Sequence, residues 1–260
     1  MAQVITSKHG TIGTIVLSNP AKYNAMSFDM WNGLPKALEA FDGDPEVRVI
    51  VMEGEGEKAF VSGSDISQFE SERTGHEATK RYNTAVEEAH LAAGRCSKPV
   101  IAKIRGICIG GGVGLAASCD VRLCADDARF RIPAARIGIG YPTEGIGRLL
   151  PLLGPQGAMD ILFSARYFTA VEALRMGLVA QVFPALEFAA QADAWISLVA
   201  QNAPLTLRAI KLATQDMLAR PGAAPGPEVI AAIAACFASN DYREGTRAFG
   251  EKRVPKFEGH

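Results

Sequence analysis

The tightest constraint in the sequence is the run GGGVG at residues 110–114, which lies between an expected strand and an expected helix. Glycines without side chains let a backbone approach a ligand closely, and a helix that starts there leaves its first N–H groups free to donate. A tight turn that only serves packing also uses such a run. The run therefore predicts either a packing turn or a backbone site for a polar or anionic group.

Two nucleotide-binding motifs compete for this run. Residues 112–117 fit the pattern G-x-G-x-x-A of dinucleotide sites, but that pattern needs an acidic residue about 20 positions further on. Asp126 and Asp127 come too soon for that role. A phosphate-binding loop of the Walker type is excluded because no Gly-Lys-Ser/Thr follows. The sequence thus disfavours a nicotinamide, flavin or nucleoside triphosphate site.

The first part of the chain predicts a hairpin, a helix and a buried strand. Residues 4–8 and 12–17 are rich in β-formers and are separated by a His-Gly turn. Ser27 has the position of an N-cap for a helix with one apolar face. Pro35 is expected to kink that helix or to delay its start. The apolar run 47–52 predicts a buried strand.

The rest of the chain predicts an α/β core followed by a helical tail. Short strands that alternate with helices indicate parallel pairing. The expected strands are 99–104, 121–125 and 178–183, and the expected helices are 77–93, 185–202, 204–219 and 228–238. We divide the chain into a core, residues 1–195, and a C-terminal helical region, residues 196–260.

Composition excludes several classes of function. The chain of 260 residues is 48% hydrophobic with a net charge of −1, so no overall field attracts nucleic acid or anionic membranes. The five cysteines are odd in number and predict small buried residues in a reducing, cytoplasmic protein. None of His9, His76, His90 and His260 lies in a metal-binding motif, and no apolar run reaches membrane-spanning length. We expect no metal site.

Three segments together resemble the crotonase (enoyl-CoA hydratase/isomerase) superfamily. They are residues 19–26 (NPAKYNAM), 58–66 (KAFVSGSDI) and 98–120, which contains the glycine run; 241–245 and 248–253 extend the match. They cover nearly the whole chain in the family's order. The resemblance implies a spiral of repeated ββα units with a C-terminal helical trimerisation region. It also implies a homotrimer or a dimer of trimers.

The resemblance implies an oxyanion hole for a CoA thioester, formed by the backbone N–H groups of Ser64 and Gly111. Reactions beside a thioester carbonyl pass through an enolate-like anion, and one fixed donor stabilises that charge by about 3–4 kcal/mol. Gly111 would lie at a helix N-terminus, whose dipole acts in the same direction. Coenzyme A would be part of the acyl-CoA substrate, so no separate cofactor is expected.

The resemblance further implies contacts to the nucleotide of CoA. Lys22 and Ala25 match positions beside the phosphates and adenine, Ser62, Asp65 and Ile66 match a turn that binds adenine through its backbone, and Phe249 and Lys252 match positions that in many members reach the nucleotide from a neighbouring subunit. The alternative for the two lysines is a solvated surface side chain.

The sequence departs from the family's hydratases at both acid–base positions. Those enzymes carry one glutamate two residues after the triple glycine and another after the proline of a Phe-x-x-Pro-Glu motif. This chain has Gly114 and Ala134 there. General acid–base catalysis contributes about 10²–10⁴-fold, so we expect ordinary hydration to be nearly lost. Decarboxylase-type or isomerase-type chemistry is favoured instead.

Residues 138–145 contain the candidates for a replacement. Tyr141 falls where methylmalonyl-CoA decarboxylase-like members also carry a tyrosine, and an apolar wall around Glu144 would raise its pKa and make it an acid or base. Alternatively, Tyr141 only lines the acyl pocket and Glu144 pairs with Arg148. Arg136 could bind a second substrate carboxylate. The remaining alternatives are a non-catalytic acyl-CoA-binding protein and a hydratase with a displaced acid or base such as Glu144.

Overall fold

The computed structural model describes residues 2–260 and contains a six-stranded sheet with the strand order β1-β2-β3-β5-β7-β10. The strands are β1 (Gln3–His9), β2 (Ile12–Ser18), β3 (Val49–Gly54), β5 (Val100–Ile104), β7 (Val121–Ala125) and β10 (Gln181–Phe183). The predicted hairpin β1–β2 is confirmed as the antiparallel edge of the sheet, and all other neighbours are parallel. The predicted α/β class with parallel pairing is therefore confirmed.

A second sheet of four short strands has the order β4-β6-β8-β9. Its strands are β4 (Ala59–Val61), β6 (Ile107–Ile109), β8 (Arg129–Arg131) and β9 (Phe168–Thr169). The pairs β3–β4, β5–β6 and β7–β8 each give one strand to either sheet, and the next long helices are α3 (His76–Arg95), α4 (Gly111–Ser118) and α5 (Thr143–Ser164). This alternation confirms the expected repeat of ββα units.

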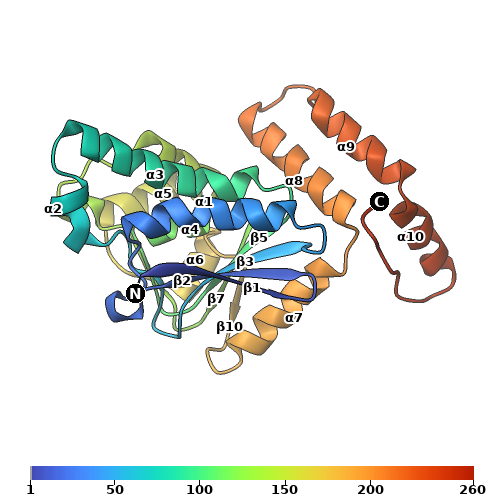
Figure 1. Ribbon diagram of the computed structural model, residues 1–260, viewed down its shortest axis with the longest axis horizontal. Helices are drawn as coiled ribbons and strands as arrows, with labels where there is room; N and C mark the ends of the chain where they lie inside the picture. Colours follow the sequence, from blue (N-terminus) through green and yellow to red (C-terminus); the bar gives the residue numbers. More distant parts are fainter. Residues whose placement is uncertain (1) are drawn as a thin grey trace.

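Helices cover both faces of the larger sheet (Figure 1). Helix α1 (Phe28–Gly43) lies with α3 on one face, and the Ser27 hydroxyl accepts from Met30 N at 3.2 Å, which confirms the predicted N-cap. The expectation that Pro35 delays the start of α1 is wrong, because the buried face of α1 outweighs the one hydrogen bond that proline removes. On the other face, α7 (Phe188–Ala200) packs on β3, β5 and β7.

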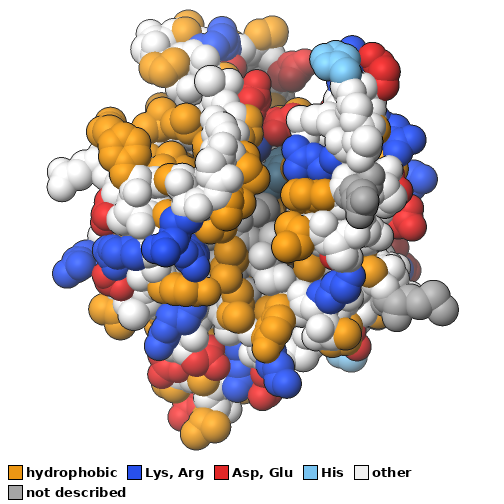
Figure 2. All heavy atoms as spheres, turned by 90° about the vertical axis from the view of Figure 1, so that its left-hand side faces the viewer, with side chains coloured by type: hydrophobic (Ala, Val, Ile, Leu, Met, Phe, Trp, Pro, Cys, Tyr) orange, Lys and Arg blue, Asp and Glu red, His pale blue; other side chains and the backbone are white. Residues whose placement is uncertain are grey.

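Short elements join these layers. They are η1 (Pro20–Lys22), η2 (Ile66–Gln68), α2 (Phe69–Glu72), η3 (Ala134–Arg136) and α6 (Ala170–Met176). The end of the molecule that carries α2 is hollowed along its middle, and hydrophobic side chains gather along that hollow (Figure 2). All five cysteines are free thiols, and four of them are buried.

The tail forms an arm of three helices, α8 (Pro204–Ala219), α9 (Pro227–Ala238) and α10 (Asn240–Gly250), which projects from the core (Figure 1). The predicted division at 195/196 falls within α7, and it stays a prediction. Within residues 2–260, no helix is long and apolar enough to cross a membrane, and no three or more metal-ligating side chains cluster.

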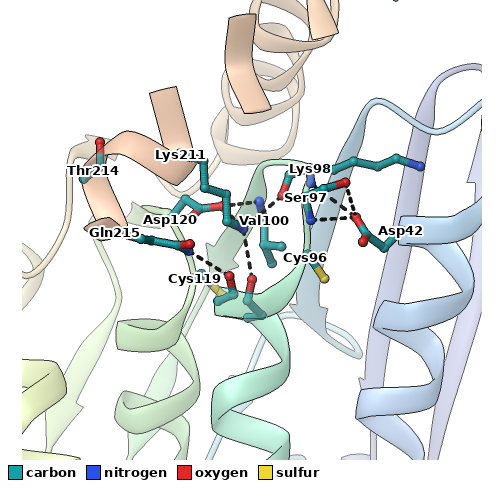
Figure 3. Close-up of polar contacts among 12 residues, drawn as sticks. Asp42, Cys96, Ser97, Lys98, Val100, Cys119, Asp120, Lys211, Thr214 and Gln215 are labelled. Atoms are coloured by element: carbon teal, nitrogen blue, oxygen red, sulfur yellow. Dashed lines mark hydrogen bonds and ion pairs between the residues drawn. The ribbon is translucent and has the colours of Figure 1, made fainter. Parts of the chain in front are cut away.

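A buried lysine attaches this arm to the core (Figure 3). Lys211 Nζ donates to the carbonyl oxygens of Ala93 and Lys98, both at 3.0 Å, and to Asp120 Oδ2 at 2.8 Å. Asp120 Oδ2 also accepts from Val100 N at 2.7 Å. The Asp120 carboxylate, two residues after the end of α4, thereby links α8 to the start of β5.

Candidate active site

Two loops meet where the oxyanion hole was predicted. Residues 63–65 pair with Met26: Met26 N donates to Gly63 O and Asp65 N to Met26 O, each at 2.8 Å. The glycine loop is held by Gly110 N, which donates to Arg131 O at 2.8 Å. A Cβ built on Gly111 would lie 4.0 Å from Gly63 Cα, so the two loops are in direct contact.

The amides of Ser64 and Gly111 are both free to bind a ligand. Gly111 is the first residue of α4, where an N–H has no acceptor within the helix. Within residues 2–260, neither amide donates to another protein atom. Two amides without a protein acceptor thus lie in loops that contact each other, and one of them is at a helix N-terminus.

Contacts at both ends of α4 fix the Gly111 amide. A Cβ on Gly112 would lie 2.2 Å from Val61 O, so α4 packs directly on β4 only because this residue is glycine. At the other end, the buried Arg122 guanidinium donates to Ala116 O at 3.2 Å and to Cys119 O at 2.6 Å. A cation at the C-terminus of a helix is stabilised by the helix dipole and caps its last carbonyls.

A second network supports the hole from the core. Trp31 Nε1 donates to the Tyr82 hydroxyl at 3.2 Å, and the Trp31 ring lies 3.2 Å from the position of a Cβ on Gly111. Burial raises the pKa of Tyr82, and its hydrogen bond with Ser64 acts in the opposite direction. Trp31 and Tyr82 are both fully buried, so they position the two donor-bearing loops.

The two positions where the resemblance implies glutamates both lie in or near the glycine loop. A Cβ on Gly110 would lie 3.9 Å from Pro133 Cδ, which brings the turn with Ala134 against the glycine loop. Ala134 is half-buried against the core. A Cβ on Gly114 would lie 2.6 Å from His90 Nε2, so an imidazole occupies the space that a longer side chain at 114 would need.

His90 is a site residue that the sequence analysis did not single out. It lies on α3 and is only 5% exposed, with Nδ1 at 2.7 Å from Val86 O and Nε2 at 3.4 Å from Gly111 O. Burial lowers its pKa to about 4, and the positive charge of Arg148 acts in the same direction. The imidazole is therefore neutral at pH 7.

Most of the residues expected to bind the nucleotide lie in two adjoining loops. Lys22 Nζ donates to Asp65 Oδ2 at 2.8 Å, and Ser62 Oγ donates to Lys22 O at 3.0 Å. Burial raises the pKa of Asp65, but hydrogen bonds from Lys22 and Ser67 outweigh it and hold that pKa below its usual value. Ala25, three residues after Lys22 in the sequence, is buried, whereas the side chain of Ile66 is exposed.

Phe249 and Lys252 lie elsewhere in the same chain. Both are exposed at the end of α10, and Figure 1 shows α10 and α2 at opposite ends of the molecule. Helix α2 follows directly on the turn with Ile66. The structure therefore does not bring Phe249 and Lys252 to the other five residues within one chain.

Comparison with known proteins identifies the family. The model of the enoyl-CoA hydratase/isomerase family matches residues 7–260. The chain belongs to this family. It is 32% identical to a peroxisomal Delta(3,5)-Delta(2,4)-dienoyl-CoA isomerase of Arabidopsis thaliana, over 94% of this chain and 91% of that one. It is also 32% identical to a short-chain-enoyl-CoA hydratase of Clostridium acetobutylicum, over 98% of this chain and 97% of that one.

Solved structures agree with this assignment. An enoyl-CoA hydratase/carnithine racemase from Magnetospirillum magneticum has a TM-score of 0.94 and 32% identity, covering 100% of this chain and 97% of that one. An enoyl-CoA hydratase from Bacillus anthracis has a TM-score of 0.90 and 26% identity, covering 99% of both. The predicted crotonase-like fold is confirmed, and the protein is an acyl-CoA enzyme of the enoyl-CoA hydratase/isomerase family.

Tyr141 lies just before α5, and Glu144 lies in its first turn. Tyr141 is half-buried against Gly145, and burial raises its pKa. Glu144 is exposed, so the expected apolar wall around it is absent. The alternative in which Glu144 pairs with Arg148 is wrong. Arg148 instead donates two hydrogen bonds, of 2.8 and 3.0 Å, to Glu87 of α3, because the two oxygens of that half-buried carboxylate match the two terminal N–H groups of the guanidinium. The catalytic roles of Tyr141 and Glu144 stay predictions.

Proposed function

We propose that the protein isomerises the double bond of an enoyl-CoA thioester, with the thioester oxygen bound by the N–H groups of Ser64 and Gly111. One observation carries this proposal. Two amides without a protein acceptor lie in contacting loops at the N-terminus of α4, while positions 114 and 134 carry no carboxylate. The site is thereby suited to stabilise an enolate and poorly suited to add water.

The balance between isomerisation and hydration follows from the number of groups that each reaction needs. Removal of a proton beside the thioester carbonyl gives an enolate, and each fixed donor stabilises it by about 3–4 kcal/mol. Isomerisation returns the same proton two carbons further along the chain, so one acid–base group suffices. Hydration must also position a water molecule. Gly114 and Ala134 therefore weaken hydration more than isomerisation.

Decarboxylation is the second candidate. Loss of CO₂ from a malonyl-type thioester gives the same enolate and needs no base to begin. The half-buried Tyr141 favours this reading, because a phenol hydroxyl is protonated at neutral pH and can donate a hydrogen bond.

Assembly into a homotrimer, or a dimer of trimers, would complete the CoA site. The arm carries large exposed apolar side chains, among them Met217, Phe237 and Phe249. An apolar groove of about 700 Å³ lies between α8, α9 and α10. In such an assembly, Phe249 and Lys252 of a neighbouring subunit would supply the nucleotide contacts that the resemblance implies. Light scattering that shows a stable monomer would overturn this assembly.

A panel of CoA thioesters tests the proposed reaction. We expect turnover of a 3-enoyl-CoA to the 2-enoyl-CoA, and hydration of crotonyl-CoA at least about 100-fold slower. Faster hydration than isomerisation would overturn the preference. Turnover of a malonyl-type thioester alone would select decarboxylation. Binding of acyl-CoA analogues without any turnover would identify a non-catalytic binding protein.

A further inference from the structure

His90 is a buried ionisable group beside the oxyanion hole that the proposed function has not yet used. Its Nε2 lies 2.6 Å from the position of a Cβ on Gly114. A Cβ on a helix tilts toward the helix N-terminus, so this position faces the end of α4 that carries the Gly111 amide. The imidazole nitrogen thus stands where a longer side chain at 114 would begin.

The hydrogen bonds of His90 determine which nitrogen carries the proton. Nδ1 lies 2.7 Å from Val86 O, and a carbonyl oxygen only accepts, so Nδ1 is the protonated nitrogen of the neutral ring. Nε2 then has a free lone pair. Its one polar contact in the described part of the chain is Gly111 O at 3.4 Å, which is also an acceptor. A buried lone pair without a donor is costly and indicates a position that a substrate or water hydrogen completes.

We propose that His90 Nε2 is the acid–base group of this site, an inference that rests on the proposed isomerase function. Nε2 accepts the proton of C2, and the electron pair of that C–H bond forms a dienolate whose charge lies on the thioester oxygen. The protonated ring then delivers the proton to C4 while the double bond moves to C2–C3. The step needs no other reactant, because the proton removed is the proton returned.

The charged groups around His90 suit this role. The ion pair of Arg148 (α5) and Glu87 (α3) lies near His90. The positive charge of Arg148 opposes protonation of the His90 ring, and the negative charge of Glu87 favours it. Burial lowers the pKa of His90 to about 4, close to that of an ordinary glutamate. The ring is therefore a base of about the same strength as the carboxylate it would replace. Once protonated, Nε2 faces a carbonyl acceptor in Gly111 O.

The substitution His90→Asn separates the base from its packing role. The asparagine amide can keep the hydrogen bond to Val86 O but places no basic nitrogen at Nε2. We expect kcat for 3-enoyl-CoA isomerisation to fall by about 100-fold or more, with the Kd of a saturated acyl-CoA unchanged within threefold. His76→Asn, at the exposed start of the same helix, is the matched control and should keep full activity. Should His90→Asn fail to fold, His90→Gln is the second variant.

A second measurement keeps the proposal separate from the proposed function. Exchange of the C2 protons of bound butyryl-CoA in ²H₂O reports the base without any isomerisation. If wild type isomerises and His90→Asn or His90→Gln does so within threefold, His90 is not the base, and the proposed function still stands. If wild type does not isomerise but exchanges C2 protons, and the variant does not, His90 is the base and the proposed function is wrong. Wild type that neither isomerises nor exchanges overturns both.

Discussion

The substitution Gly112→Ala tests how closely the two halves of the oxyanion hole are packed. A Cβ at this position would lie 2.2 Å from Val61 O and 2.9 Å from Val61 Cβ, whereas real Cβ contacts stay above about 3 Å. Strand β4 and helix α4 must therefore separate by about 1 Å. Strand β4 ends two residues before Gly63, so this displacement moves the Ser64 amide relative to the Gly111 amide.

The magnitude follows from the two costs. Overpacking of a core contact destabilises by about 1–3 kcal/mol, and a 1 Å misplacement of catalytic groups lowers rates by about 10²-fold. We expect Gly112→Ala to lower kcat/KM for a CoA thioester by about two orders of magnitude and to lower the melting temperature. Gly94→Ala is the control, because a Cβ there has no heavy atom within 4 Å. Activity within threefold of wild type at an unchanged melting temperature would refute the packing of β4 on α4.

Three further predictions concern other contacts. Gly114→Glu alone should destabilise the protein and gain no hydration activity, because its Cβ would lie 2.6 Å from His90 Nε2. The double variant His90→Ala/Gly114→Glu makes room for the glutamate and should hydrate crotonyl-CoA faster than His90→Ala alone. Equal hydration rates of these two variants in a kinetic assay would contradict this. The pKa of His90 is about 4 in the folded protein and 6.5 in the unfolded chain, so unfolding takes up a proton between pH 4 and pH 6.5. Denaturant titrations should show that the free energy of unfolding falls by about 3 kcal/mol as the pH falls from 6.5 to 4. The variant His90→Asn should lose less unfolding free energy over the same range. Lys211→Met leaves Asp120, whose side chain is 27% exposed, without its cation and should cost about 2 kcal/mol of unfolding free energy; an unchanged denaturation midpoint would contradict a supporting role for that pair.

Elements with strong local signals were predictable from the sequence. Ser27 marked the start of α1, the His-Gly turn marked the hairpin, and the triple glycine marked the N-terminus of α4. The second sheet was missed, because strands of two or three residues are too short to show a period of two. Helix α5 was hidden by Pro151, Pro155 and Gly154, and the structure indeed bends there at a positive φ of 64°.

The candidate donors of the site came from the family resemblance, whereas the residues that support them could not be found from the sequence. Ser64 and Gly111 follow from their positions in motifs that resemble the family, and their role stays a prediction. His90 lies on the buried face of α3 with Ala89 and Ala93. Its contact with Gly114 depends on how α3 packs on α4, which no local pattern encodes. The alternative pairing of Arg148 with Glu144 was wrong for the same reason, because Glu87 contacts Arg148 from another helix.

A crystal structure with a bound acyl-CoA tests the proposed oxyanion hole most directly. We expect the thioester oxygen to lie within about 3.1 Å of both Ser64 N and Gly111 N. A thioester oxygen bound by only one of these amides, or turned toward Glu144 instead, would contradict it.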